Sequence, residues 1–225
     1  MEIVVVQTGP LRVNSLIVKI SQTEAFVVDP ASCEFSKDEI IIKNQLEKMG
    51  LKAVALVLTH GHFDHVCGLP FLHKSFPDAK ILIHQNDSAL IGHDSKIAQE
   101  NHLQKMEFGE FLPFVCDLPE PTDFLSEGKN LQECANIQGE SEATQNLQNW
   151  RVLETPGHTQ GSVCLWNERE SVLISGDTLF NGSWGRTDLP GGNEAQIHQS
   201  LKKIFSTVPS NTTVYSGHDF RPFFL

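Results

Sequence analysis

Three histidines and one aspartate stand within six positions of the chain, in the order His60, His62, Asp64 and His65. Neutral imidazole and carboxylate are ligands that zinc, iron and manganese accept in proteins. The apolar run 53–58 comes directly before them, and if it is a buried strand, Gly61 allows a tight turn that aims several side chains at one point. The stretch therefore predicts a metal site, and the alternative is a histidine-rich surface turn.

Three later side chains repeat this arrangement. His158, Asp177 and His218 each follow an apolar run and stand beside a glycine. Loops at strand ends bring distant parts of a chain to one edge of a sheet, so the shared pattern predicts that these residues face residues 60–65. One Gly-His after a strand is usually only a turn. Three of them with a Gly-Asp are together typical of one site.

The elements that must position these residues begin with strands. Residues 3–7, 13–20 and 25–29 are short apolar or β-branched runs separated by turn residues, which predicts an antiparallel meander. Residues 37–49 carry apolar positions four and three apart and are followed by Gly50, as in an amphipathic helix with a glycine stop.

Strands and helices then alternate through the ligand stretch. Residues 51–58 form a continuous apolar run of the kind that is buried on both faces. Residues 66–76 predict a helix and residues 79–84 another strand, and this alternation indicates helices that cover the faces of a sheet. His84 ends the second strand, where we expect a hydrogen-bonded histidine at the rim of the site.

The middle of the chain, residues 86–149, lacks clear periodicity. A helix is indicated at 88–100, but the rest carries scattered Gly and Pro and ends in a stretch rich in Gln and Asn. We expect an insertion or lid, partly irregular, within a single domain that spans residues 1–225.

The C-terminal third is again regular. Residues 150–154 predict a strand, and residues 163–166 and 171–174 predict a hairpin. Residues 194–205 carry apolar side chains on one helical face, and residues 212–215 predict a last strand before His218.

Composition excludes several classes of function. The 225 residues include 17 Lys and Arg against 28 Asp and Glu, a formal net charge of -11, whereas a nucleic-acid-binding protein needs a basic face. No apolar run reaches the length of a membrane span, and the N-terminus lacks the pattern of a secretion signal. The five scattered cysteines favour reduced thiols. We therefore expect a cytoplasmic protein with a small-molecule substrate and neither a nucleic-acid nor a membrane partner.

Four motifs in order give the chain a family resemblance. They are His-x-His-x-Asp-His at 60–65, Pro-Gly-His-Thr-x-Gly-Ser at 156–162, Ser-Gly-Asp-Thr-Leu-Phe at 175–180 and Ser-Gly-His-Asp at 216–219. In this order they resemble the metallo-β-lactamase superfamily. The resemblance implies an α+β fold, a four-layer αβ/βα sandwich in which helices flank two mixed β-sheets, with two divalent metal ions at one edge.

The resemblance also implies a role for each ligand. The seven residues divide into a set for the first metal, a set for the second metal and a bridge, which are His60, His62 and His158; Asp64, His65 and His218; and Asp177. Zinc is the metal that we expect, and the same ligands also suit iron and manganese.

Within the superfamily, the segment 185–192 resembles the short glyoxalase II-like hydrolases, which cleave hydroxyacyl thioesters of glutathione. This second resemblance implies that a metal-bound hydroxide is the nucleophile and that Asp64 both binds metal and orients that hydroxide. Arg186 is the expected contact for a substrate carboxylate, because a guanidinium pairs with two oxygens at once. The alternative is that Arg186 braces Asp188.

A second branch of the superfamily is an alternative. The Gly-Arg-Thr-Asp segment and the Gly-His-Asp ending also resemble the persulfide dioxygenases, which hold one iron with three protein ligands, here His60, His158 and Asp177. Metal content separates the two hypotheses. Two metals with thioester cleavage indicate the hydrolase, and one iron with oxygen uptake on glutathione persulfide indicates the dioxygenase.

Overall fold

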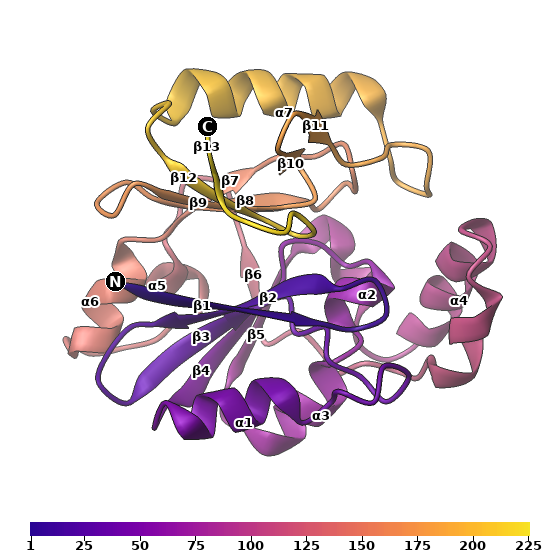
Figure 1. Ribbon diagram of the computed structural model, residues 1–225, viewed down its shortest axis with the longest axis horizontal. Coiled ribbons are helices and arrows are strands. Elements are labelled where there is room, and N and C mark those ends of the chain that lie inside the picture. Colours follow the sequence, from indigo (N-terminus) through magenta and orange to yellow (C-terminus); the bar gives the residue numbers. More distant parts are fainter.

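Two β-sheets pack face to face in the computed structural model, which describes residues 1–225 (Figure 1). The first sheet contains, in spatial order, β1 (Glu2–Thr8), β2 (Val13–Lys19), β3 (Glu24–Val28), β4 (Lys52–Val57), β5 (Lys80–His84) and β6 (Asp123–Leu125). The second contains β13 (Phe223–Phe224), β12 (Thr213–Ser216), β9 (Val172–Gly176), β8 (Val163–Asn167) and β7 (Arg151–Glu154).

Helices cover the outer face of each sheet, which completes four layers. The helices α1 (Ile41–Lys48) and α3 (Leu69–Ser75) lie on the first sheet, and α7 (Glu194–Thr207) lies on the second (Figure 1). This arrangement confirms the predicted αβ/βα sandwich. No helix combines the length and the apolar character that crossing a membrane requires.

Both sheets are mixed, as the resemblance implied. β1, β2 and β3 form the predicted antiparallel meander, and β3 to β6 run parallel. In the second sheet β7, β8 and β9 are antiparallel, while β12 joins β9 in parallel. Because parallel strands end at the same edge, the loops after β3, β4 and β5 are neighbours, and so are the loops after β9 and β12.

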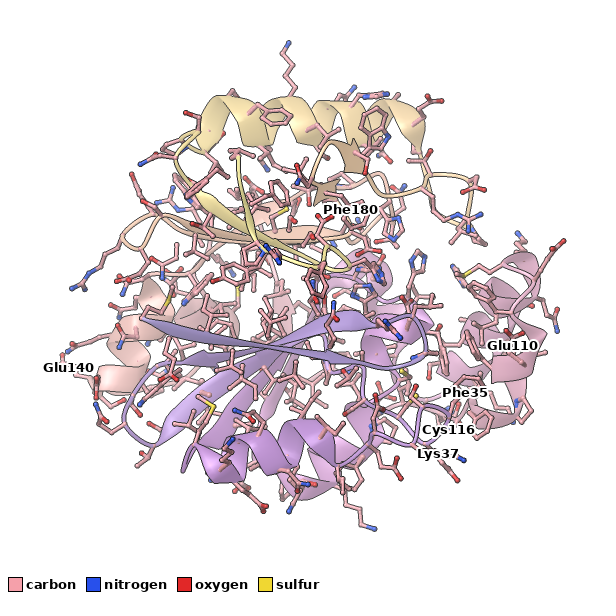
Figure 2. All side chains as sticks on the ribbon, viewed as in Figure 1. Phe35, Lys37, Glu110, Cys116, Glu140 and Phe180 are labelled. Carbon is pink, nitrogen blue, oxygen red and sulfur yellow. The ribbon has the colours of Figure 1, made fainter.

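Successive side chains of the buried strands point to opposite faces of the sheet and enter different hydrophobic clusters. In β2, Leu16 and Val18 enter a cluster between the two sheets, whereas Ile17 enters a cluster beneath α1 and α3. A third cluster joins the second sheet to α7 through Ile197 and Leu201. Side chains fill the space between the layers (Figure 2). Burial on both faces explains why the central strands appear in the sequence as continuous apolar runs.

Two predicted helices have different bounds. α1 begins at Ile41 and not at residue 37, because Lys37 has a φ of 57°, which a right-handed helix does not contain. The helix predicted at 66–76 begins later than expected, because Val66 ends the short helix α2 (Phe63–Val66) and α3 begins only at Leu69. Gly68 lies between these two helices, and a Cβ there would come within 2.4 Å of the Pro30 carbonyl oxygen.

The first part of the segment 86–149 lies beside the ligand loops. It contains the 3₁₀-helix η1 (Gln85–Leu90), α4 (Ser95–Lys105) and the 3₁₀-helix η2 (Gly109–Phe114). The helix predicted at 88–100 is thus interrupted, because Gly92 and Asp94 both have positive φ. The Gln99 side chain of α4 donates hydrogen bonds to the carbonyls of Gly61 and Leu90.

The later part of this segment belongs to the sandwich itself. β6 pairs with β5, and α5 (Leu131–Cys134) and α6 (Glu142–Gln148) bury Leu131 and Leu147 between the sheets. Regular elements therefore occupy more of this part than the expectation of a partly irregular segment suggested. The Asn and Gln residues that obscured the pattern all lie outside the buried core, and Asn130 and Ser141 cap the two short helices.

A small hairpin follows β9 in the chain. It pairs β10 (Leu179–Phe180) with β11 (Ser183–Trp184), and the sequence did not predict it.

Opposite ends of the chain meet near this hairpin. The Asn14 backbone N–H donates to the Gly217 carbonyl at 2.7 Å, and its side chain donates to the carbonyls of Ser216 and Asp219. The first hairpin of the fold therefore holds the loop that carries His218.

Candidate metal centre

All seven predicted ligands converge where the two sheets face each other. Four lie on the turn after β4 and on α2, and the other three follow β7, β9 and β12. Three groups of potential ligand atoms lie within 4.8 Å of one another, and they are His60, His62 and His158; Asp64, His65 and His218; and Asp29, His60 and His65. The first two groups coincide with the two predicted metal sets.

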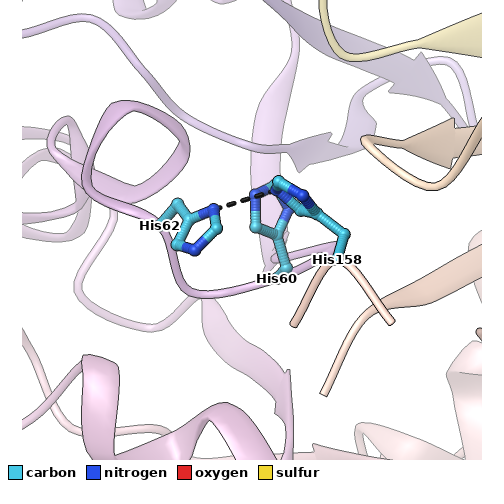
Figure 3. Close-up of side chains that lie close together, drawn as sticks. All are labelled: His60, His62 and His158. Carbon is cyan, nitrogen blue, oxygen red and sulfur yellow. Dashed lines mark hydrogen bonds between the residues drawn. The ribbon is translucent and has the colours of Figure 1, made fainter. Parts of the chain in front are cut away.

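The first set consists of three imidazoles (Figure 3). His62 Nδ1 lies 2.9 Å from His158 Nε2. The Nε2 atoms of His60 and His62 are buried and have no hydrogen-bond partner. Buried polar atoms are nearly always satisfied, so nitrogen atoms left without partners in a cluster of imidazoles fit a bound metal ion.

Asp177 lies between the two sets. Its Oδ2 atom is 3.7 Å from His158 Nε2 in the first set and 3.3 Å from His218 Nε2 in the second. Its Oδ1 atom is 3.4 Å from His65 Nε2, while Asp64 Oδ2 is 3.5 Å from His218 Nε2. The Asp177 carboxylate therefore lies close to ligand nitrogens of both sets.

The two sets differ in charge. Burial lowers the pKa of His60 and of His62 well below the usual value, so both are neutral, which is the form that binds metals. Burial also opposes protonation of His65 and His218, but the carboxylates of the site, Asp177 foremost, raise the pKa of His65 well above its usual value and that of His218 to about 10. In the second set, a bound metal ion would replace the protons of the two imidazoles.

Asp29 belongs to the third group, but its oxygens already have partners. The backbone N–H and hydroxyl of Thr59 each donate to it at 2.7 Å, and His65 Nδ1 lies 2.9 Å away. A hydrogen bond at Nδ1 fixes the imidazole and leaves Nε2 for a metal. Asp29 therefore positions His65. The one sequence feature that could have indicated this role is the place of Asp29 directly after β3.

Asp87 joins the two ligand loops and was not predicted. Its Oδ2 accepts hydrogen bonds from the Gly61 N–H at 2.9 Å and from the Thr159 hydroxyl at 2.7 Å, and its Oδ1 accepts one from the Gly161 N–H at 2.7 Å. The side chain is buried. One carboxylate thus connects the turn that carries His60 to the loop that carries His158.

We expect Asp87→Asn to lower metal affinity about 10- to 100-fold, because the amide replaces one of the two acceptor oxygens with an NH₂ donor that faces a backbone N–H group. Competition with a chelating dye measures this affinity. Asp94→Asn, a change at an exposed acid of the same region, is the control and should leave affinity unaltered. Equal affinities of the two variants would contradict the role of Asp87.

The glycines beside the ligands provide space. A Cβ on Gly217 would lie 2.0 Å from Asp177 Oδ1, and one on Gly185 would lie 2.0 Å from the Asp177 carbonyl oxygen. Any side chain at these positions must displace Asp177. Glycine is required at these two positions because the backbone passes too close to Asp177 for any side chain.

Gly217→Ala is expected to weaken metal binding by about 100-fold, the upper part of the range for residues that support ligands. Metal content after dialysis against a weak chelator is the measurement. Gly109→Ala is the matched control, since nothing lies within 4 Å of its added Cβ. Normal metal retention by Gly217→Ala would show that Asp177 can move without cost.

Arg186 has its guanidinium occupied. Nε and one terminal nitrogen donate to the two carboxylate oxygens of Asp188 at 2.7 and 2.8 Å. The backbone carbonyl of Arg186 lies 2.7 Å from His158 Nδ1, so it fixes that ring. In this structure Arg186 braces Asp188, which is the alternative role. Recognition of a substrate carboxylate by Arg186 stays a prediction.

His84 pairs with Glu154 at 3.0 Å, as expected of a rim histidine.

A cavity of about 280 Å³ lies over the centre. Its walls include five of the metal-ligand side chains and five apolar ones, which are His62, Asp64, His158, Asp177 and His218, and Leu11, Met106, Phe108, Phe180 and Leu189. A larger cavity of about 450 Å³ lies beside Met1 and Trp150, but it holds none of the ligand groups. The chemistry therefore belongs to the smaller cavity.

Comparison with known proteins agrees with this geometry. The sequence model of the Metallo-beta-lactamase superfamily matches residues 8–218. The Probable metallo-hydrolase YqgX of Bacillus subtilis is 31% identical over 210 residues, which are 93% of this chain and 86% of that protein. A Hydroxyacylglutathione hydrolase of Synechococcus is 29% identical over 91% of this chain but only 63% of its own length. The crystal structure of TTHA1623 in a di-iron-bound form is 26% identical, with a TM-score of 0.76, and covers 98% of this chain and 94% of that one.

Proposed function

The chain belongs to the metallo-beta-lactamase superfamily, and from that premise we propose that it is a metal-dependent hydrolase that cleaves a thioester. The observation that carries the proposal is the convergence of two ligand sets around Asp177 beneath a cavity. The similarity to a hydroxyacylglutathione hydrolase supports hydroxyacylglutathione-type thioesters as the first substrates to test. The size of the cavity, about 280 Å³, supports a small-molecule substrate.

We propose two divalent metal ions, with zinc as the first choice. His60, His62 and His158 would hold one ion, the set of Asp64, His65 and His218 would hold the other, and Asp177 would bind both. The completeness of the second set supports two metals over the single iron of a persulfide dioxygenase. When bound, divalent ions would lower the pKa of a coordinated water to about 7 and would polarise a carbonyl oxygen.

The protein side chains supply orientation and proton transfer. Asp64 lines the cavity, so its carboxylate can accept a proton from water and direct the oxygen lone pair toward a carbonyl carbon. His158 is fixed by the Arg186 carbonyl and His65 by Asp29, so both rings keep their orientation during the reaction. A thiol has a pKa near 8.5, so the thiolate leaves without a dedicated acid.

Metal analysis combined with an assay on S-lactoylglutathione tests the proposal. Protein reconstituted with zinc should hold two metal ions per chain. It should cleave the substrate to free glutathione, whose thiol a chromogenic disulfide detects. A lactone and a phosphodiester serve as comparison substrates and should react more slowly. One iron per chain with oxygen uptake on glutathione persulfide would support the dioxygenase instead.

A further inference from the structure

Five apolar side chains line the cavity beside its ionic floor, and we call them the apolar wall. This apolar wall consists of Leu11, Met106, Phe108, Phe180 and Leu189. They come from four segments, which are the β1–β2 turn, the chain after α4, β10 (Figure 2) and the loop after β11. Only Leu189 is buried, and the other four are partly exposed. Partly exposed apolar side chains that line a cavity give an apolar part of a ligand a surface to pack against.

The lining of the cavity contains one arginine and no lysine. Among its twelve lining residues, Arg186 is the only lysine or arginine, and Asp188 occupies its guanidinium. Glutathione bears two carboxylates and one ammonium group. A site that recognises such a carrier needs cationic side chains that match the carboxylates. For the two carboxylates of glutathione the lining thus offers only the one guanidinium that already pairs with Asp188.

The volume leads to the same conclusion. A cavity of about 280 Å³ lies just below the usual range of small-molecule sites, which begins at about 300 Å³. It is large enough for an acyl group and the thioester, and too small to enclose a tripeptide carrier as well. The metal-ligand floor fixes the carbonyl end, so the acyl chain is the part that meets the apolar wall.

We infer that the protein selects its thioester by an apolar acyl chain that packs on Leu11, Met106, Phe108, Phe180 and Leu189, and that a neutral thiol carrier serves as well as glutathione. The inference rests on the proposed thioester hydrolysis. Burial of one methylene contributes about 0.8 kcal/mol, so kcat/KM should rise about fourfold for each added methylene until the cavity is full.

A substrate grid tests this selectivity. Acetyl, propanoyl, butanoyl and pentanoyl thioesters are prepared on glutathione and on N-acetylcysteamine, a neutral thiol. We expect a rise of about 60-fold in kcat/KM from acetyl to pentanoyl and values within about threefold between the two carriers. A flat or falling series, or a preference above about 100-fold for glutathione, would overturn the inference.

A variant pair locates the effect. Phe108→Ala should lower kcat/KM for the pentanoyl thioester about 10-fold while the acetyl thioester changes less than twofold. Phe205→Ala removes an exposed phenylalanine of α7 outside the cavity and should change neither value. Circular dichroism confirms that both variants are folded. Equal losses on both thioesters in Phe108→Ala would contradict a role in chain-length selection.

Ligand binding separates this inference from the proposed function. Calorimetry compares acetate with pentanoate on the zinc-loaded protein, and we expect about 60-fold tighter binding of pentanoate, reduced in Phe108→Ala. If no thioester is cleaved but this difference appears, the proposed hydrolysis fails and the apolar wall stands. If thioesters are cleaved but pentanoate binds no better than acetate, the hydrolysis stands and the inference fails.

Discussion

Removal of the metal ions with a chelator is expected to abolish hydrolysis and to lower the melting temperature by about 5–10 °C. The ligands come from loops of both sheets, so a bound metal joins the two halves only in the folded state. A ligand present at 100 times its dissociation constant stabilises a fold by about 2.7 kcal/mol, and about 1 kcal/mol corresponds to 2–4 °C for a chain of this length.

Calorimetric melting and a thioester assay measure the two effects on one sample. Chelator added together with excess zinc is the control, because it separates metal loss from any direct effect of the chelator. Addition of zinc to the stripped protein should restore both activity and melting temperature. Full activity after complete removal of metal would overturn the proposed function.

The second large effect is expected for Asp64→Asn, which should reduce kcat about 10³-fold while the protein keeps two metal ions. Asparagine retains an oxygen that binds metal but cannot accept a proton from water, and general acid–base groups contribute 10²- to 10⁴-fold. Asp64 lines the cavity directly, whereas Asp29 and Asp87 act through hydrogen bonds to other groups.

Metal content and kcat are measured together for this variant. Asp78→Asn removes a carboxylate that is 84% exposed and pairs only with Lys52, so it should leave kcat within about twofold of the parent. Loss of one metal ion from Asp64→Asn would show that Asp64 serves to hold the metal, and the lower kcat would then not indicate proton transfer. Retention of both ions with normal kcat would exclude it from proton transfer.

The ligands could be predicted because their signal is local. Each is a histidine or aspartate that follows an apolar run and has a glycine nearby, and the clash distances at Gly185 and Gly217 show why glycine is needed. The sandwich was predictable for the same reason, since buried strands such as β4 and β9 are continuous apolar runs.

The supporting residues could not be found in this way. Asp87 acts by accepting hydrogen bonds from Gly61 and Gly161, which lie 26 and 74 residues away along the chain. An acidic residue among polar neighbours carries no mark of such contacts. The regular elements within residues 123–149 have no clear sequence pattern. One reason is that β6 has only three residues and is held in place by pairing with β5.

The hydrogen bonds between Asn14 and the loop that carries His218 have a consequence for the order of folding. They join residues more than 200 positions apart, and contacts of such high sequence separation form late because closing a long loop costs entropy. A chain emerging from the ribosome therefore presents His60 to His65 long before His218 exists. The second metal set, which includes His218, is therefore complete only when synthesis has reached the last strand pair.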